Sequence, residues 1–150
     1  MPNDLNRGTM AGGQHRLTLR VYYEDTDAGG VVYHANYLRF FERGRTEMLA
    51  LLGIGDIAKL AGEGLIYVVG AAELRFLQPA RLGDVLTVIT KVEEVRGARC
   101  RVHHRVSRDG VGLVEGQIML ALVGPDGRPR PQPKHWIEAL KAAAGADEQA

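Results

Sequence analysis

The second half of the chain contains four apolar, β-rich stretches with very short connections between them. These stretches span residues 66–77, 85–95, 99–107 and 111–123. The connections are QPARLGD at 78–84 and the turns Arg96-Gly97 and Asp109-Gly110, and Asp-Gly is a strong signal for a tight hairpin. Parallel strands need a crossover of about a dozen residues or more, so consecutive strands here must be antiparallel neighbours. The sequence therefore predicts one antiparallel sheet.

A helix is predicted ahead of these strands, from near Asn36 to Leu52. At 100° per residue its large apolar side chains fall on one side and most of its charged side chains on the other. Gly44 falls on the apolar side, where a helical glycine costs about 1 kcal/mol relative to alanine. Either the helix approaches a sheet closely at Gly44, or this glycine is merely tolerated. An alternating segment at 17–23 predicts a further strand, so the order β-α-β-β-β-β indicates an α+β domain.

The chain of 150 residues has the length of one domain. We expect this domain to span residues 15–140, with a short helix over Lys134–Ala143 near its end. The flanking segments 1–14 and 141–150 lack periodicity and are predicted to be flexible tails.

Composition and charge exclude several classes of protein. A formal net charge of +1 argues against general binding of nucleic acid. No apolar segment reaches the roughly 20 residues that span a bilayer, and the polar N-terminus does not resemble a secretory signal. Cys100 is the single cysteine, which excludes an intramolecular disulfide and a four-cysteine zinc site. We expect a cytoplasmic protein without an integral membrane segment.

Ionisable residues concentrate in the loop before the helix, which reads EDTDAGGVVYHAN over residues 24–36. The first N–H groups of a helix have no intrahelical partner and carry partial positive charge, so they can stabilise an oxyanion. A carboxylate upstream, turned back by Gly29 and Gly30, can face an electrophile held there. Aspartates before helices are also common caps and turn formers, and a lone histidine is more often structural. The spacing alone therefore leaves both interpretations open.

Two patterns in the sequence suggest metal sites and neither fits. Asp25, Asp27 and Gly30 match positions 1, 3 and 6 of an EF-hand loop, but Gly29 and Asn36 occupy positions that need oxygen ligands. A strand rather than a helix also precedes this loop, so we reject calcium. The pair at 103–104 is not a metal site, since neighbouring side chains of a strand point to opposite faces.

A second group of charged residues lies along the third β-rich stretch and in the turn before it. It consists of Arg96, Arg99, Arg101 and Arg105, with His103 among them. Such a stripe is either a solvated strand face or a surface for an anionic ligand such as a nucleotide phosphate.

The segment YYEDTDAGGVVYHANYLRFFERGRTEML, residues 22–49, resembles the signature of the YbgC-type, Tol–Pal-associated acyl-CoA thioesterases. These are close relatives of the 4-hydroxybenzoyl-CoA thioesterases. FLQPARLGD at 76–84 and VRGAR at 95–99 resemble later segments of the same family. The resemblance implies the hotdog fold, in which an antiparallel sheet wraps around a long central helix. It also implies a homodimer or homotetramer with active sites at the dimer interface.

The resemblance places the family's catalytic aspartate on Asp27 and its histidine on His34. The backbone N–H at or beside His34 corresponds to the group that polarises the thioester carbonyl, and Asp25 receives no catalytic role. The implied reaction is hydrolysis of an acyl-CoA thioester to a free acid and CoA, with Asp27 as nucleophile or general base. This chemistry requires no metal and no other cofactor.

Four further residues are predicted to bind the substrate. We expect Tyr33 and Asn36 to contact it, and Arg96 or Arg99 to contact the nucleotide portion of CoA. The sequence does not predict the length or type of the acyl group.

Two other functions are consistent with the sequence. One is a non-catalytic acyl-CoA-binding or scaffold protein of the Tol–Pal cell-envelope machinery, against which the intact pair of Asp27 and His34 argues. The other is a hotdog dehydratase, which relies on a differently placed histidine with a carboxylate on the central helix.

Overall fold

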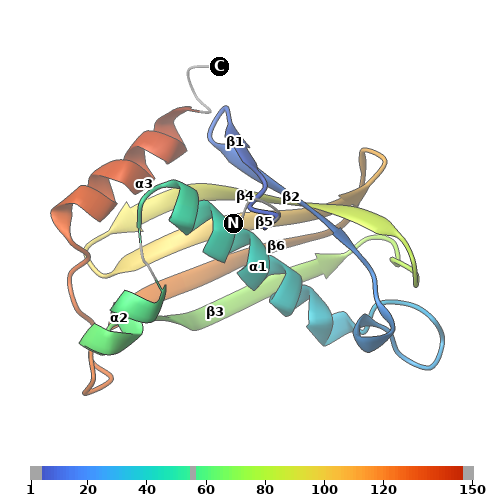
Figure 1. Ribbon diagram of the computed structural model, residues 1–150, viewed down its shortest axis with the longest axis horizontal. Coiled ribbons are helices and arrows are strands. Elements are labelled where there is room, and N and C mark those ends of the chain that lie inside the picture. The colour runs from blue at the N-terminus through green and yellow to red at the C-terminus, as the bar shows by residue number, and fades with distance from the viewer. Residues whose placement is uncertain (1–4, 55–56, 147–150) are drawn as a thin grey trace.

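A computed structural model describes residues 5–54 and 57–146, in which a six-stranded antiparallel sheet curves around a long helix (Figure 1). The strands are β1 (Thr9–Ala11), β2 (Gln14–Arg20), β3 (Ile66–Phe76), β4 (Val85–Arg96), β5 (Arg99–Arg108) and β6 (Val111–Val123). Their order across the sheet is β1-β2-β4-β5-β6-β3, so β3 forms one edge. This arrangement confirms the predicted α+β hotdog fold.

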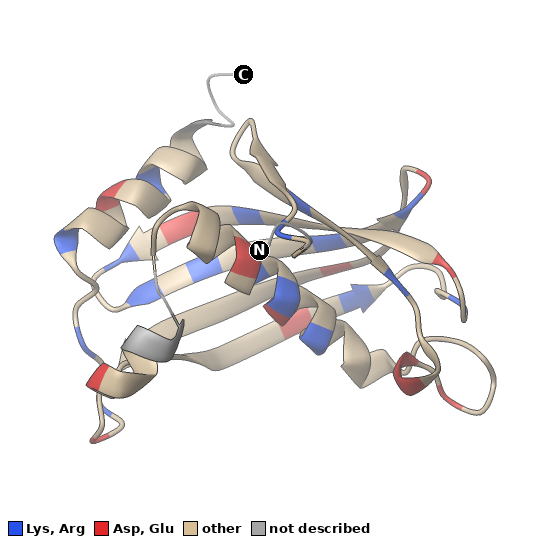
Figure 2. Ribbon diagram, in the orientation of Figure 1, with Lys and Arg blue, Asp and Glu red and all other residues tan. Residues whose placement is uncertain are grey.

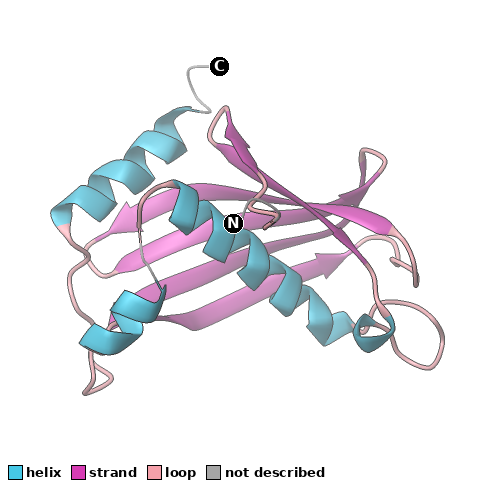
Figure 3. Ribbon diagram, in the orientation of Figure 1, coloured by secondary structure: helices cyan, strands magenta, loops and turns pink. Residues whose placement is uncertain are grey.

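Within the described residues three α-helices accompany the sheet (Figure 3): α1 (Tyr37–Leu51), α2 (Ile57–Glu63) and α3 (Lys134–Ala146). Two 3₁₀ turns, Tyr23–Asp25 and His34–Asn36, lie in the loop between β2 and α1. No helix in the described residues combines the length and apolarity that a membrane crossing requires.

The predicted alternation along β5 is confirmed. Its even-numbered side chains from Cys100 to Val106 are buried beneath α1, while the intervening side chains face the opposite side of the sheet. The β5–β6 connection is the predicted hairpin turn, with φ of 51° at Asp109 and 81° at Gly110. Positive φ at both turn residues matches the right-handed twist of the flanking strands.

The helix α1 lies unusually close to the sheet at two glycines. A Cβ on Gly44 would lie 2.6 Å from Oγ1 of Thr90, and a Cβ on Gly116 of β6 would lie 2.5 Å from the ring of Phe41. Side-chain carbons do not occupy such distances, so any larger residue at either position would force its neighbour to shift. The question that the sequence left open at Gly44 is thereby settled in favour of close helix–sheet packing.

The ordered part of the chain is longer at both ends than predicted. Thr9–Ala11 pair with β2 across a turn at Gly12-Gly13, so the prediction of a flexible tail over residues 1–14 is wrong for residues 9–14. Backbone hydrogen bonds rather than an apolar pattern hold this short edge strand, which explains why periodicity missed it. At the other end α3 continues to Ala146, past the predicted start of the tail at 141–150. Residues 1–4 and 147–150 of the two predicted tails lie outside the described residues.

Replacing Gly44 by alanine should destabilise the protein although alanine favours helix. The added methyl meets Thr90, and overpacking of this kind costs about 1–3 kcal/mol, which exceeds or offsets the gain of about 1 kcal/mol in helix propensity. Gly62 of α2 is the matched control, because a Cβ there has no neighbour within 4 Å. Urea unfolding should show Gly62→Ala more stable than Gly44→Ala, and the reverse order would refute the close approach.

A row of polar side chains crosses the buried face of the sheet beneath α1. His15 of β2, Thr90 of β4 and His104 of β5 are neighbours in register and are fully buried. Oγ1 of Thr90 lies 3.0 Å from Nδ1 of His104, and Nη1 of Arg45 lies 3.3 Å from its Nε2. Arginine can only donate, so Nε2 of His104 accepts and Nδ1–H donates to Thr90. Burial, followed by the nearby charge of Arg45, holds the pKa of His104 well below its ordinary value.

Acid should therefore destabilise the fold through His104. Below about pH 6.5 the unfolded chain binds a proton on this imidazole that the folded chain excludes. The free energy of unfolding should fall by up to about 1.4 kcal/mol per pH unit in that range. We expect His104→Gln to lose this part of the pH dependence in urea unfolding between pH 8 and 5, while His103→Gln on the opposite face keeps it. Equal slopes in wild type and His104→Gln would contradict this role.

Candidate active site

The loop between β2 and α1 doubles back on itself just before the helix. Residues 25–27 run antiparallel to residues 31–33 and exchange backbone hydrogen bonds of 2.9 Å with them. Gly30 turns the chain with a φ of 78°. The loop that contains these residues lies at the N-terminal end of α1 (Figure 1). The pairing brings Asp27 back towards the segment that ends at His34, just before the helix, although seven positions separate the two residues in sequence.

The connection between β3 and β4 packs against this loop and is hydrogen-bonded to it. The N–H of Val32 donates to the carbonyl of Ala80 at 2.8 Å. The carboxylate of Asp84 accepts from the N–H of Arg81 at 2.8 Å and from the guanidinium of Arg108 at 2.6 Å. These two donors, the Arg81 N–H first, hold the pKa of Asp84 below its usual value. The ion pair between Asp84 and Arg108 of β5 thus fixes the turn that supports the loop.

Asp25 is a structural residue of the loop. Its carboxylate is buried, and it accepts from the N–H of Tyr22 at 2.8 Å and from the side-chain amide of Asn36 at 2.9 Å. The second bond ties the beginning of the loop to the start of the helix. Asn36 was predicted to contact substrate, but it is only 6% exposed and its amide serves this internal bond.

Asp27 has the opposite surroundings. It is exposed, and one of its carboxylate oxygens, Oδ1, accepts from the N–H of Gly29 at 2.8 Å. Within the described part of the chain its other oxygen, Oδ2, has no hydrogen-bond partner. A carboxylate held by one bond, with one free oxygen, is both positioned and available for reaction.

His34 is exposed at the start of the first helical turn and lies among aromatic rings. Its ring centroid is 4.5 Å from that of Tyr33 and 6.5 Å from that of Phe76 at the end of β3. Tyr33 is 50% exposed, so these two predicted residues share one surface. Phe76 was not predicted, because its role depends on the contact between β3 and the helix start.

Two backbone N–H groups at the helix start are free to donate. The N–H of Tyr33 is bonded to Asp25, and that of Asn36 is bonded to Tyr33. For the N–H groups of His34 and Ala35, no acceptor is found among residues 5–54 and 57–146. Such groups carry partial positive charge and favour an oxyanion.

Arg96 and Arg99 lie at the opposite end of the sheet from Asp27. They flank the turn between β4 and β5, where Arg96 pairs with Glu94 at 3.0 Å. The strand β4 begins beside the loop and runs away from it for 12 residues, or about 40 Å at 3.3 Å per residue. Figure 2 shows the basic segments at that far end. One chain therefore unites Asp27, His34 and Tyr33 but not these arginines.

Comparison with known proteins places this geometry in a family. The family model described as the thioesterase-like superfamily matches residues 21–143. Acyl-CoA thioesterase YbgC of Haemophilus influenzae is 45% identical over 105 residues, covering 70% of this chain and 77% of the relative. Acyl-CoA thioester hydrolase YbgC of Escherichia coli is 40% identical over 128 residues, covering 84% of this chain and 95% of the relative.

A solved structure agrees with these relatives. The probable thioesterase of Bartonella henselae superposes with a TM-score of 0.75 at 38% identity, covering 80% of this chain and 99% of that one. The resemblance seen in the loop and helix signature is thus confirmed over most of the chain. The chain belongs to the thioesterase-like superfamily, and within it to the YbgC family of hotdog-fold proteins.

Proposed function

We propose that this protein hydrolyses acyl-CoA thioesters to a free acid and CoA. One observation carries the proposal: the loop that bears the exposed carboxylate of Asp27 is paired with the segment leading into α1, where the N–H groups of His34 and Ala35 are free. The carboxylate can attack the thioester or accept a proton, and the N–H groups can stabilise an oxyanion. The YbgC relatives, which are named for acyl-CoA hydrolysis, support CoA as the thiol of the substrate.

In the proposed reaction the thioester carbonyl oxygen faces the helix start. Asp27 either attacks the carbonyl carbon, forming a mixed anhydride as the C–S bond breaks, or takes a proton from a water that attacks the same carbon. In the first case water then hydrolyses the anhydride and regenerates the carboxylate. The free N–H groups stabilise the oxyanion, and the imidazole of His34 orients substrate or water. CoA thiolate is a good leaving group, so no strongly tuned general acid is required.

We further propose that the edge strand β3 pairs with its copy in a second subunit. Four large apolar side chains at or next to this strand are half exposed: Ile66, Val69, Phe76 and Leu77. An unpaired edge of 11 residues with such side chains is a template for strand pairing. A two-fold contact pairs the strand antiparallel with itself, so the Ile66 end of one subunit lies beside the Phe76 end of the other.

This dimer also gives Arg96 and Arg99 a place in the proposal. The pairing brings the β4–β5 end of one subunit to the same side as the Asp27 loop of its partner. Arg96 and Arg99 would therefore meet the nucleotide portion of a CoA that is bound at the active site of another subunit rather than of their own.

Light scattering should give the mass of a dimer or a dimer of dimers at micromolar concentration. Val69→Asp should shift this equilibrium towards monomer, because it buries a carboxylate in the paired edge. Val111→Asp is the matched control, since Val111 is equally exposed at the β5–β6 turn, away from the edge. A monomeric wild type, or the same shift in both variants, would refute the β3 interface.

Asp27→Asn should lower turnover by several orders of magnitude while leaving the fold intact. An amide can neither attack the thioester nor accept a proton from water, so kcat should fall by about 100- to 10,000-fold. The measurement is thiol release from the best acyl-CoA of a substrate panel, with circular dichroism as the test of folding. Near wild-type turnover of Asp27→Asn would overturn the proposed mechanism.

Two further variants separate the reacting carboxylate from the structural one. Asp25→Asn should lower the unfolding temperature, because it breaks a buried hydrogen-bond pair, with a much milder effect on kcat of the folded enzyme. His34→Ala should lie between Asp25→Asn and Asp27→Asn in kcat, since the backbone N–H survives the change.

A further inference from the structure

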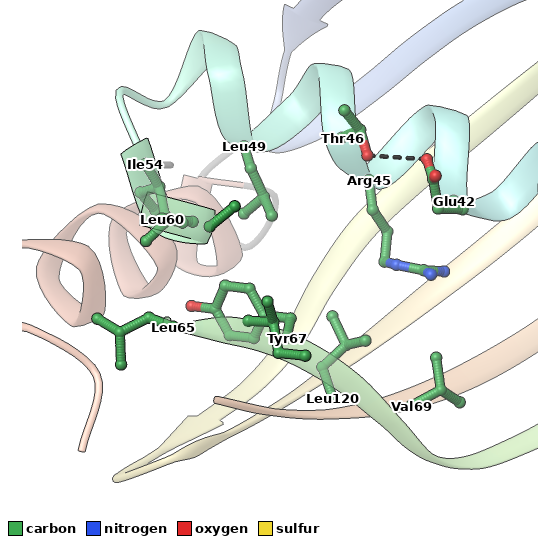
Figure 4. A pocket seen from close by; sticks show the side chains of 12 residues that line it. Glu42, Arg45, Thr46, Leu49, Ile54, Leu60, Leu65, Tyr67, Val69 and Leu120 are labelled. Carbon is green, nitrogen blue, oxygen red and sulfur yellow. Dashed lines mark hydrogen bonds between the residues drawn. The ribbon is translucent and has the colours of Figure 1, made fainter. Parts of the chain in front are cut away.

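A pocket of about 270 Å³ lies between α1, α2 and β3, apart from the loop that carries Asp27 (Figure 4). Its walls are mainly aliphatic and include Leu49, Leu60, Leu65, Val69 and Leu120. Pockets for small molecules begin at about 300 Å³ and are lined mostly by apolar side chains with few polar groups. The size and lining therefore suit a short, mainly apolar chain.

One cationic side chain, Arg45, enters this apolar pocket. Figure 4 shows it running from α1 towards the sheet. The guanidinium has five N–H donors. Among the described residues its one hydrogen-bond partner is Nε2 of His104, at 3.3 Å, and no carboxylate lies within 4 Å of it. Glu42 on the same helix is exposed, and its carboxylate accepts from the hydroxyl of Thr46 at 2.8 Å.

The charge of Arg45 is only partly offset within the pocket. Glu42 also lines the pocket and favours the charged guanidinium, but among the described residues it forms no ion pair with Arg45. Burial lowers its pKa, which is the electrostatic cost of holding a cation away from water. His104 is a neutral acceptor and occupies only one of the donors. A carboxylate is the group that matches a guanidinium best, because it can accept two parallel hydrogen bonds and cancel the charge.

The proposed dimer brings this pocket to the reaction centre. Within one chain Val69, which lines the pocket, is seven residues from Phe76, or about 23 Å along β3. Antiparallel pairing of β3 places the Ile66–Val69 end of one subunit beside the Phe76 end of the other. Phe76 lies against His34, so the acyl group of a bound thioester can extend from one subunit into the pocket of its partner.

We propose that this pocket holds the acyl group and that Arg45 selects an acyl group ending in a carboxylate. The preferred substrates would then be CoA monothioesters of dicarboxylic acids. This inference rests on the proposed thioester hydrolysis and on the proposed β3 dimer: it names the class of acyl group that the same site accepts.

Matched pairs of substrates test the selection in the full-length protein. Adipoyl-CoA and hexanoyl-CoA differ only in the terminal group, as do suberoyl-CoA and octanoyl-CoA. Wild type should show the higher kcat/KM for the carboxylated member of each pair. Arg45→Met should lower that ratio by about 10- to 150-fold, the range for loss of a hydrogen bond to a charged group, with most of the change in KM. The kcat/KM for octanoyl-CoA should rise in this variant, because a desolvated charge leaves the path of an apolar chain.

Arg39→Met is the control, because Arg39 is an exposed residue of the same helix and the change is identical. It should leave the ratio as in wild type. A wild-type preference for the unsubstituted acyl group, or an equal ratio in wild type and Arg45→Met, would overturn the role of Arg45 while thioester hydrolysis stands. Failure of wild type to hydrolyse any thioester of the panel would instead overturn the proposed function and this inference with it. The wild-type comparison decides the matter even if Arg45→Met does not fold.

Discussion

The close seating of α1 on the sheet is the constraint on which the rest of the molecule depends. Gly44 and Gly116 allow the helix backbone and the ring of Phe41 to approach where a Cβ would collide. This seating fixes the direction of the helix, so its first turn meets the end of β3 at Phe76. It also turns Arg45 inward over His104 rather than outward to solvent. The position of the helix start and the entry of Arg45 into the apolar pocket both depend on this close packing.

The loop before α1 divides two roles between two acids that are two positions apart. Asp25 is buried and fully hydrogen-bonded, and it holds the loop to the helix start. Asp27 is exposed and keeps one oxygen free. A reactive carboxylate must be held in a fixed position while its oxygen atoms stay free to react. The hydrogen bonds of Asp25 fix the loop and so provide that position for Asp27. The support from Asp84 and Arg108 extends the same rigidity to the sheet below.

Much of the fold could be predicted from sequence, because it depends on local patterns. The alternation along β5, the Asp-Gly turn and most of the apolar face of α1 appear as expected, although Leu51 at the end of that face is exposed. Local patterns could not show that Asn36 is bonded to Asp25 across 11 positions. They could have predicted that Arg45 points inward, since it lies four residues after Phe41 and three before Met48 on the buried face of α1. The distance of Arg96 and Arg99 from Asp27 follows only from the direction in which β4 runs.

The central claim is that the thioester is held between Asp27 and the start of α1. A crystal structure of the Asp27→Asn variant with an intact acyl-CoA tests it most directly, because a disabled enzyme should retain its substrate. The account predicts the carbonyl oxygen at about 2.7–3.1 Å from the backbone N–H of His34 or Ala35. It also predicts that the carbonyl carbon faces the side chain at position 27. A thioester bound elsewhere, or one whose carbonyl points away from the helix start, would contradict the account.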